Sequence, residues 1–389
     1  MKNIFFTLLF CLYAIFSHAQ SAISAYRIFG KITTVDNQEF KGYIQWGNNN
    51  YWIDFFEGQK TRNPYSSYFK PGSGVVFRYN NRTYTQPQTH NFCCRFGNLE
   101  QIHPTGDREA RIQLKNRQEI ILRKGNTNDI GTGILITTEN EKIQVKWEHI
   151  SEITFMQADI KDNFPLNPVY GSVKSSQGIY KGLITWNYNQ KRSPEKNDNI
   201  NIFLNKMAKI IRPQKSFQLL AQERQSSTPF YTNSNILEPL GSILVNMPNT
   251  GRAIVPPAQF NELTVIPASE LKLLTYDDFS QAGLLKGEVI TQNNQTISGT
   301  LAYDLDESWN FEVLDGKNNN ITYCIPLQYI QSIEPKNYKY SFITLKNGSK
   351  LSLGESCDVN QENNGVLVLR ENQTPVYIIW SEVKTIILQ

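Results

Sequence analysis

A glycine–aromatic motif occurs three times in this chain and constrains its fold more than any other feature. Each copy opens on a glycine and runs through an apolar stretch and a polar turn to a second glycine and an aromatic residue. The opening glycine, second glycine and aromatic are Gly30, Gly42 and Trp46, then Gly171, Gly182 and Trp186, then Gly287, Gly299 and Tyr303. Internal repetition at a regular interval is the mark of a repeat architecture, so the motif predicts three copies of one structural unit.

A second element follows the motif and supports the same prediction. Residues 112–153 and 343–386 both contain Leu-Lys-Asn, then a glycine with three aliphatic residues, then a tryptophan with aliphatic residues three and six positions later. The middle third carries a degraded copy in which Pro257 stands at the tryptophan position. Because proline donates no hydrogen bond to a β-ladder, we expect the strand there to end early or to lie at an edge.

Apolar and polar residues alternate within these elements, as at Ile143, Val145 and Trp147, which is typical of half-buried antiparallel strands. Asn347-Gly348 is a strong two-residue hairpin signal. The paired glycines suit bulges or sharp bends. The spacing after Trp147 departs from alternation and predicts one turn of 3₁₀ helix between two strands.

The fold class predicted is therefore all-β, with three tandem repeats that are each a small antiparallel β-barrel or β-sandwich. We place these domains at residues 25–157, 168–267 (the degraded copy) and 284–389. Polar, proline-containing segments separate them. Residues 64–91 form an insertion in the first domain, which we expect to be an extended hairpin or loop.

The glycine–aromatic segment resembles the first two strands of SH3-like and Sm-like small β-barrels, and the whole unit resembles a class of uncharacterised exported bacterial β-repeat proteins. The first resemblance implies a small curled sheet. The second carries no activity with it. The RNA-binding residues of Sm proteins have no matching positions here.

Residues 1–19 are predicted to be a signal peptide. Lys2 supplies a positive start, Ile4 to Phe16 is apolar, and small residues precede a cleavage site after Ala19. The apolar run is shorter than the roughly 20 residues of a spanning helix, and Cys11 lacks the context of a lipoprotein signal. We therefore expect a periplasmic or secreted protein with no transmembrane segment in the mature chain. A net charge of +4 is too small to indicate a nucleic-acid partner.

The sequence contains no motif that predicts an enzyme, a metal site or a cofactor. We interpret the acidic stretches at Asp304–Glu307 and Asp277–Asp278 as solvated turns. His90, Cys93, Cys94 and His103 offer zinc-binding atoms, but their spacing fits no standard zinc template. We therefore expect no catalytic residue, no metal and no cofactor.

Four cysteines follow the predicted signal peptide, and an oxidising compartment favours pairing. Cys324 and Cys357 are the candidate disulfide pair, since both fall in the third domain. Cys93 occupies the position that matches Cys324, and the state of Cys93 and Cys94 stays open.

Aromatic residues divide into two groups. Those that recur between units are predicted to be core: Trp46, Trp147, Trp186, Tyr303 and Trp380. Those outside the shared pattern are the candidate sugar- or peptide-binding surface: Tyr51, Trp52, Tyr65, Tyr68, Tyr79 and Tyr84.

The leading hypothesis is a non-enzymatic exported protein of the cell envelope that recognises a protein, peptide or glycan through its surface. The alternatives are a hydrolase or metal-dependent enzyme acting on envelope polymers, and a structural spacer. Two carboxylates facing one cleft would favour the hydrolase.

Overall fold

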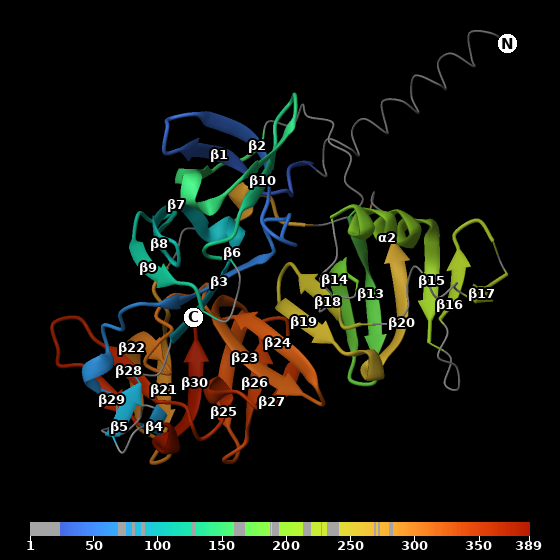
Figure 1. Cartoon of the computed structure of the whole chain (residues 1–389). Helices are drawn as coiled ribbons and strands as arrows, with labels where there is room; N and C mark the ends of the chain where they lie inside the picture. Colours follow the sequence, from blue (N-terminus) through green and yellow to red (C-terminus); the bar gives the residue numbers. More distant parts are fainter. Residues whose placement is uncertain are drawn as a thin grey trace, which may run out of the picture.

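The chain folds almost entirely into antiparallel β-sheet. The computed structural model describes residues 24–68, 75–79, 82–86, 90–125, 129–158, 168–186, 188, 194–212, 219–226, 228–231, 241–267, 270, 273–279 and 283–389. Two large sheets and one separate hairpin contain its strands (Figure 1), so the all-β prediction is confirmed. The predicted signal peptide lies outside the described residues. Within the described part, none of the helices has both the length and the apolar character that a membrane crossing requires.

The first sheet contains ten strands from the first third of the chain, which we call the first unit (residues 24–158). Their order across the sheet is β11-β10-β2-β1-β12-β7-β8-β9-β3-β6. In chain order they are β1 (Phe29–Thr34), β2 (Glu39–Gln45), β3 (Phe55–Lys60), β6 (His90–Arg95), β7 (Leu99–Gly106), β8 (Glu109–Leu114), β9 (Glu119–Arg123), β10 (Ile134–Thr137), β11 (Lys142–Val145) and β12 (Ile150–Phe155). The predicted insertion contains the separate hairpin of β4 (Val75–Tyr79) and β5 (Arg82–Gln86).

Strands of the last third, the third unit (residues 283–389), pair in the same order. Their ladders run β29-β28-β22-β21-β30-β25-β26-β27-β23-β24. In chain order they are β21 (Lys286–Thr291), β22 (Thr296–Tyr303), β23 (Val313–Asn318), β24 (Ile321–Pro326), β25 (Ile330–Pro335), β26 (Tyr340–Leu345), β27 (Lys350–Gly354), β28 (Val366–Leu369), β29 (Val376–Ile378) and β30 (Val383–Leu388). The first and third units therefore share one strand order.

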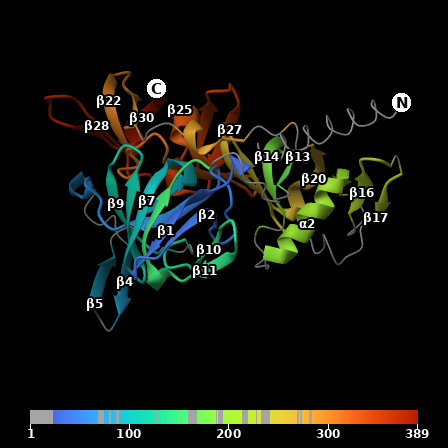
Figure 2. The ribbon, with the colours of Figure 1, turned by 90° about the horizontal axis from the view of Figure 1, so that it is seen from above.

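The second unit (residues 168–267) forms a shorter version of this arrangement, with ladders β19-β18-β14-β13-β20-β15-β16-β17. Its strands are β13 (Val169–Ser175), β14 (Ile179–Thr185), β15 (Met207–Ile211), β16 (Leu220–Glu223), β17 (Phe230–Tyr231), β18 (Ile243–Met247), β19 (Gly251–Val255) and β20 (Phe260–Ile266). A helix, α2 (Pro194–Lys206), lies between β14 and β15 where the first unit has β3 and β6. Strand β19 also pairs with β24, which joins the second and third units in one sheet. Figures 1 and 2 show the first unit beside both of the others.

The repeated glycines lie opposite each other in the first hairpin of each unit: Gly30 with Gly42, Gly171 with Gly182, and Gly287 with Gly299. A Cβ atom on Gly42 would collide with the backbone carbonyl of Thr137 on β10, and one on Gly182 with that of Asn246 on β18. The expectation of bulges is wrong here, because the hairpin ladders run through both glycines without a register shift. Glycine is required by the close approach of a neighbouring backbone.

The predicted 3₁₀ turns are confirmed at η3 (Trp147–His149) and η9 (Trp380–Glu382). The second unit forms the same turn at η4 (Pro257–Gln259). The expectation that Pro257 shortens a strand or marks an edge is wrong, because β19 has partners on both sides and ends before the turn. Pro257 stands at the first turn position, where its missing N–H has no partner to lose.

The recurring aromatics form the core, as predicted. Trp46 packs edge-on against Trp147 with ring centroids 6.3 Å apart, and Tyr303 packs the same way against Trp380 at 6.1 Å. Trp186 packs against Phe260 at 5.6 Å. All of these rings are buried.

The barrel alternative is wrong for the first unit, because its ten-stranded sheet ends at β11 and β6 and these two strands do not pair. One core cluster nevertheless contains Ile134 from β10, Leu122 from β9 and Phe56 from β3. The open sheet therefore bends around a common core, as the layers of a sandwich do.

A candidate ligand cavity where the units meet

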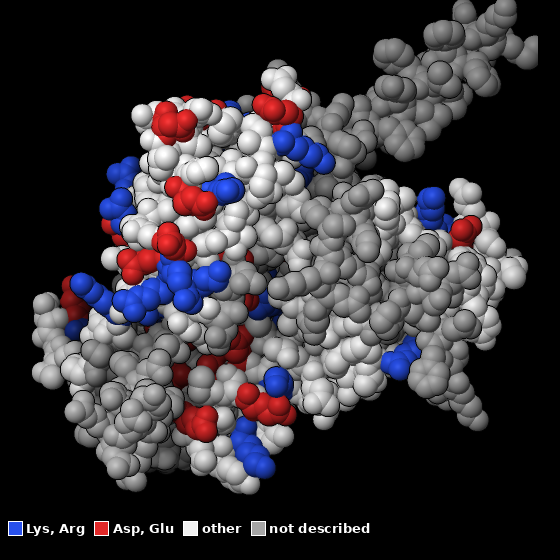
Figure 3. Space-filling model, in the orientation of Figure 1, with Lys and Arg blue, Asp and Glu red and all other residues white. Residues whose placement is uncertain are grey.

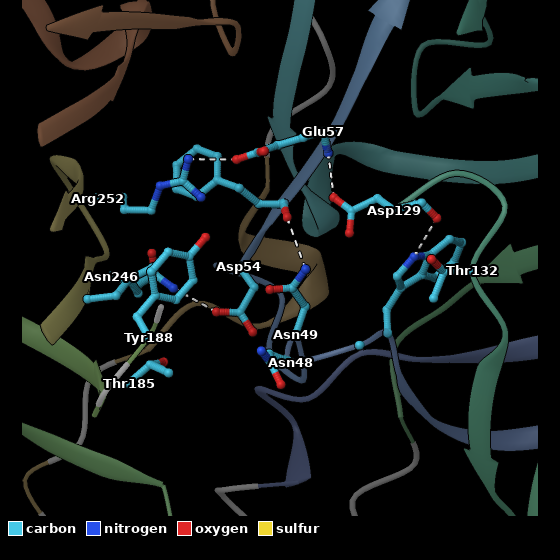
Figure 4. Close-up of a pocket in the computed structure, with 14 residues that line it drawn as sticks. Asn48, Asn49, Asp54, Glu57, Asp129, Thr132, Thr185, Tyr188, Asn246 and Arg252 are labelled. Carbon is cyan, nitrogen blue, oxygen red and sulfur yellow. Dashed lines mark hydrogen bonds and ion pairs between the residues drawn. The ribbon is translucent and has the colours of Figure 1, made fainter. Parts of the chain in front are cut away.

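A cavity of about 400 Å³ lies where the first and second units meet (Figure 4). The first unit contributes the loop between β2 and β3, strand β3 and the loop before β10. The second unit contributes β14 with the segment that follows it, β18 and β19. The lining residues are Trp46, Gly47, Asn48, Asn49, Asp54, Phe55, Glu57, Asp129, Thr132, Thr185, Tyr188, Leu244, Asn246 and Arg252. Amide, hydroxyl and carboxylate groups predominate, so the cavity suits a polar ligand.

Asp54 holds the loop between β2 and β3 in shape. Its Oδ2 accepts the backbone N–H groups of Asn50 (2.8 Å) and Tyr51 (2.9 Å). Its Oδ1 accepts Nδ2 of Asn246 from the second unit at 2.7 Å. Burial raises the pKa of Asp54 to about 6, although these hydrogen bonds oppose the rise. Both oxygens of this carboxylate are therefore engaged by the protein.

Asp129 is the carboxylate most available to a ligand. Its Oδ2 accepts the backbone N–H of Glu57 at 2.8 Å, and its backbone carbonyl accepts Nε1 of Trp46 at 2.9 Å. No hydrogen bond to its Oδ1 is found among the described residues. Burial raises the pKa of Asp129 to about 7, and the charges of Glu57 and Asp54 add to the rise. Asp129 therefore titrates close to neutral pH.

Arg252 of β19 enters the site from the second unit. Its Nη2 lies 2.6 Å from Oε1 of Glu57 and 3.1 Å from Sγ of Cys324 on β24. Its guanidinium also lies 4.8 Å from the ring centroid of Phe55. One side chain thus contacts the first and third units, and its charge is compensated by Glu57.

Glu57 and Arg252 also line a second cavity, of about 340 Å³. It is lined mainly by the first and third units, and its members include Cys93, Asp315 and Cys324. Burial raises the pKa values of both thiols, so they stay protonated near neutral pH. The Glu57–Arg252 ion pair therefore borders both cavities.

The third unit contains a loop built on the same framework. Glu312 Oε2 accepts the N–H groups of Ser308 (2.7 Å) and Trp309 (3.0 Å), as Asp54 does for Asn50 and Tyr51. Asp358 Oδ2 accepts the N–H of Asp315 at 2.6 Å, as Asp129 does for Glu57. The Tyr303 hydroxyl donates to the backbone carbonyl of Asp358, which matches the contact of Trp46 with Asp129.

The acidic residues of this loop are buried, so the prediction of a solvated turn at Asp304–Glu307 is wrong. Asp304 is 5% exposed, and Asp306 and Glu307 are 8% exposed. Two contacts contribute to this burial: Lys60 Nζ of the first unit lies 2.5 Å from Glu312 Oε1 and 3.1 Å from Asp306 Oδ1, and Asp304 accepts hydrogen bonds from Asn364 of its own unit. Asp277 and Asp278, by contrast, are exposed as predicted.

Tyr51 and Trp52 do not form a binding surface. Tyr51 is 9% exposed, and Trp52 is fully buried with its ring 4.5 Å from that of Tyr276. Phe155 lies on another side of Trp52 at 6.1 Å. The prediction is wrong because the Asp54 loop turns these rings into the core of the first unit.

Tyr65 and Tyr68 pack against an apolar cluster of the third unit that contains Ala302, Leu305 and Leu367. The ring of Tyr68 lies 6.4 Å from that of Tyr377. These two tyrosines hold the insertion against the third unit, so they were wrongly assigned to a free surface. The side chains of Tyr79 and Tyr84 lie outside the described residues.

The predicted Cys324–Cys357 disulfide is wrong, and Cys93 and Cys94 are free as well. Cys324 packs against Phe55, Val313 and Cys93. Cys357 begins the 3₁₀ turn η8 (Cys357–Val359), and its Sγ lies 3.4 Å from Oδ1 of Asp358. The two thiols therefore face different surroundings.

Sequence reasoning missed Asp54, Glu57, Asp129 and Arg252. One signal was present: Asp54-Phe-Phe-Glu57-Gly58 matches Glu312-Val-Leu-Asp315-Gly316 at the same place in the two units. Arg252 and Asn246 carry no such signal, since they come from another unit. On the face shown in Figure 3, basic and acidic side chains neighbour each other over the first unit.

No family model matches this chain, and no curated protein matches it. One solved structure, described as a streptogramin B lyase structure, aligns with 87% of this chain and 99% of its own at 8% identity, with a TM-score of 0.12. A likeness this low carries no argument about fold or function.

Proposed function

We propose that this chain is a non-enzymatic, exported recognition protein of the cell envelope, which binds a glycan in the cavity between the first and second units. The observation that carries the proposal is the lining of that cavity. Asn48, Asn49, Thr132, Thr185 and Tyr188 present amide and hydroxyl groups to one space. A sugar hydroxyl both donates and accepts hydrogen bonds, so it suits such a mixed set.

The charges at the site favour a neutral ligand. Asp54 is engaged through both oxygens, and Glu57 is paired with Arg252. This leaves Asp129, whose raised pKa weakens its negative charge near neutral pH. A ligand with a strong charge of either sign would therefore find little compensation in the cavity.

The volume and position of the cavity agree with this proposal. Ligand pockets commonly measure about 300–1,000 Å³ and occur at domain interfaces, and about 400 Å³ places this one at the lower end. The cavity thus accommodates one or two sugar residues rather than a protein surface. The export prediction rests on residues 1–19 and is part of the same proposal.

The test is a glycan array probed with the purified protein, followed by calorimetric titration of the best ligand. We expect Asn48→Ala and Tyr188→Phe to weaken binding at least tenfold, because each removes a polar group of the lining. Asn140→Ala changes an exposed asparagine of the first unit outside the cavity and should leave affinity unchanged. Equal affinities for all of these variants would exclude the cavity as the glycan site.

A hydrolase acting on an envelope polymer is the second candidate, favoured by Asp129 and Asp54 facing one cavity with raised pKa values. General acid catalysis needs a carboxyl group that is protonated near neutral pH. Incubating the bound glycan with the protein and searching for new reducing ends separates the two candidates. Release that disappears in Asp129→Asn would establish the hydrolase and refute pure recognition.

A further inference from the structure

Two β-hairpins from different units meet at the second cavity, and each contributes one cysteine to it. Strands β3 and β6 form the hairpin of the first unit, and β23 and β24 form the matching hairpin of the third. Cys93 lies directly opposite Glu57 in the first hairpin, and Cys324 lies directly opposite Asp315 in the other. The two cysteines therefore occupy equivalent positions in the two units, and both line the cavity.

The strand register places both thiols on the faces that meet. Residues directly opposite each other in a ladder, and residues two apart along a strand, lie on the same face of a hairpin. Cys93 therefore shares a face with Phe55, and Cys324 shares a face with Val313. These four residues pack together in one small cluster between the units. The two thiols thus approach each other across a unit boundary.

Arg252 gives an independent sign of this proximity. Its Nη2 lies 2.6 Å from Oε1 of Glu57 and 3.1 Å from Sγ of Cys324. One nitrogen atom therefore bridges the cysteine of the third unit and the residue directly opposite Cys93. Directly opposite residues have Cβ atoms about 4.5–5.5 Å apart, so the Cys93 side chain starts close to the same point.

We propose that Cys93 and Cys324 form a disulfide, which joins the first unit to the third, when the protein meets an organic disulfide as oxidant. The structure describes the dithiol form, in which both cysteines are free. This proposal does not depend on glycan binding.

The cross-link forms by two thiol–disulfide exchanges. Cys93 is half-buried and lines the cavity, so its thiolate attacks one sulfur of the reagent, forms a mixed disulfide and releases one reagent thiol. Cys324 is 5% exposed; its thiolate, which the adjacent Arg252 guanidinium stabilises, attacks the Cys93 sulfur and releases the second reagent thiol. The two protein thiols lose two protons and two electrons, and the reagent gains them.

The test uses bis(2-hydroxyethyl) disulfide, which is small enough to enter the cavity, on the full chain at about pH 8.5, where a larger fraction of each thiol is ionised. A second sample is refolded from urea with the same reagent, so that burial does not limit the reaction. After the remaining thiols are alkylated, intact mass should show two fewer alkylated thiols than in reduced protein. Tryptic peptides 83–95 and 318–336 should be linked. The midpoint of urea unfolding should rise, because the cross-link closes a long loop of chain.

Matched variants identify the pair. Cys93→Ala and Cys324→Ala should each abolish the linked peptides and the rise of the urea midpoint. Cys94→Ala should keep both, because successive residues of a strand point to opposite faces and Cys94 is buried in the core of the first unit. Cys357→Ala should keep both as well, since Cys357 lies outside the cluster that contains Cys93 and Cys324.

Three results would overturn the proposal. The first is a full set of alkylated thiols in both wild-type samples, a result that depends on no variant. The second is a mixed disulfide of the reagent on Cys93 or Cys324 without linked peptides, which would show that the thiols are too far apart to join. The third is a cross-link that persists in Cys93→Ala and disappears in Cys94→Ala or Cys357→Ala, which would assign it to another pair.

Discussion

Lys60 offers the sharpest test of how the units hold each other, and Lys60→Met is the perturbation we would make first. Its ammonium group comes from β3 of the first unit and bonds to Glu312 and Asp306 of the third. The side chain of Lys60 is 6% exposed, and those of Asp306 and Glu312 are 8% and 2% exposed. Methionine keeps most of the length and apolar volume of lysine and removes only the charge and the donors.

The expected loss of stability follows from burial. Removing one partner of a buried ion pair costs about 3–5 kcal/mol, because the remaining charge is left without compensation in a poorly solvated site. The pair Lys317–Glu355 supplies the matched control, since its side chains are 43% and 57% exposed. An exposed pair contributes about 0–1 kcal/mol, so Lys317→Met should cost no more than that.

The cost of Lys60→Met should also depend on pH. Burial raises the pKa of Glu312 in the folded protein, and Lys60 opposes the rise, so the variant should raise it further. A carboxyl group whose folded pKa lies above its unfolded value loses its contribution to stability as pH rises through that folded pKa. The difference between wild type and variant should therefore be larger at pH 7.5 than at pH 5.

Urea unfolding followed by tryptophan fluorescence at both pH values measures these differences. The reasoning is refuted if Lys60→Met costs no more than Lys317→Met at pH 7.5. It is also refuted if the cost is the same at pH 5, since an uncompensated carboxylate must become less unfavourable when it is protonated.

Three further predictions concern the first unit and the thiols. In the wild type, the free energy of unfolding should fall by on the order of 4 kcal/mol between about pH 4 and pH 7, because the raised pKa of Asp129 makes the folded protein hold a proton that the unfolded chain releases. Asp129→Asn should remove this fall, and parallel curves of urea stability against pH for the two proteins would contradict the prediction. Gly42→Ala should cost about 1–3 kcal/mol in urea unfolding because its Cβ has no room, whereas Gly106→Ala, with no atom nearby, should stay within about 0.5 kcal/mol. Cys357 is free and its residue is exposed, but burial raises the pKa of its thiol, so alkylation in the folded, unreduced protein should be slow near neutral pH and faster at alkaline pH, as intact mass would show, whereas a disulfide would block the reaction at both pH values.

The strands and turns could be predicted from local chemistry. Alternating residues such as Ile143 and Val145 indicate a strand, and the spacing after Trp147 indicates a 3₁₀ turn, because both features depend on neighbours in the chain. The order of the strands across each sheet depends instead on pairings between distant segments. One edge of strand β24 pairs with β19 of another unit, and no local sequence pattern predicts this pairing.

The candidate sites were harder to predict for two physical reasons. Tyr51 and Trp52 lie outside the repeated motifs. Tyr51 nevertheless forms an isolated β-bridge with Arg27, as Trp309 does with Leu284 in the third unit. A position outside the motifs therefore did not mean an exposed side chain. The acidic residues near Asp304 were judged by their hydrophilicity, but Asp306 is buried against Lys60 of a different unit. Burial produced by contacts between units cannot be read from a single segment.

The two loops that follow Trp46 and Tyr303 show how one framework can acquire different chemistry. Both keep a carboxylate that binds two backbone N–H groups, and both receive a side-chain donor from a neighbouring unit, Asn246 at Asp54 and Lys60 at Glu312. Asn246, the donor to the first-unit loop with its asparagines, is neutral. Lys60, the donor to the third-unit loop with Asp306 and Glu307, is cationic. Each loop is therefore matched to the surface that covers it. It follows that a unit separated from its neighbours would lose these donors to its buried carboxylates, so both loops depend on the assembled chain.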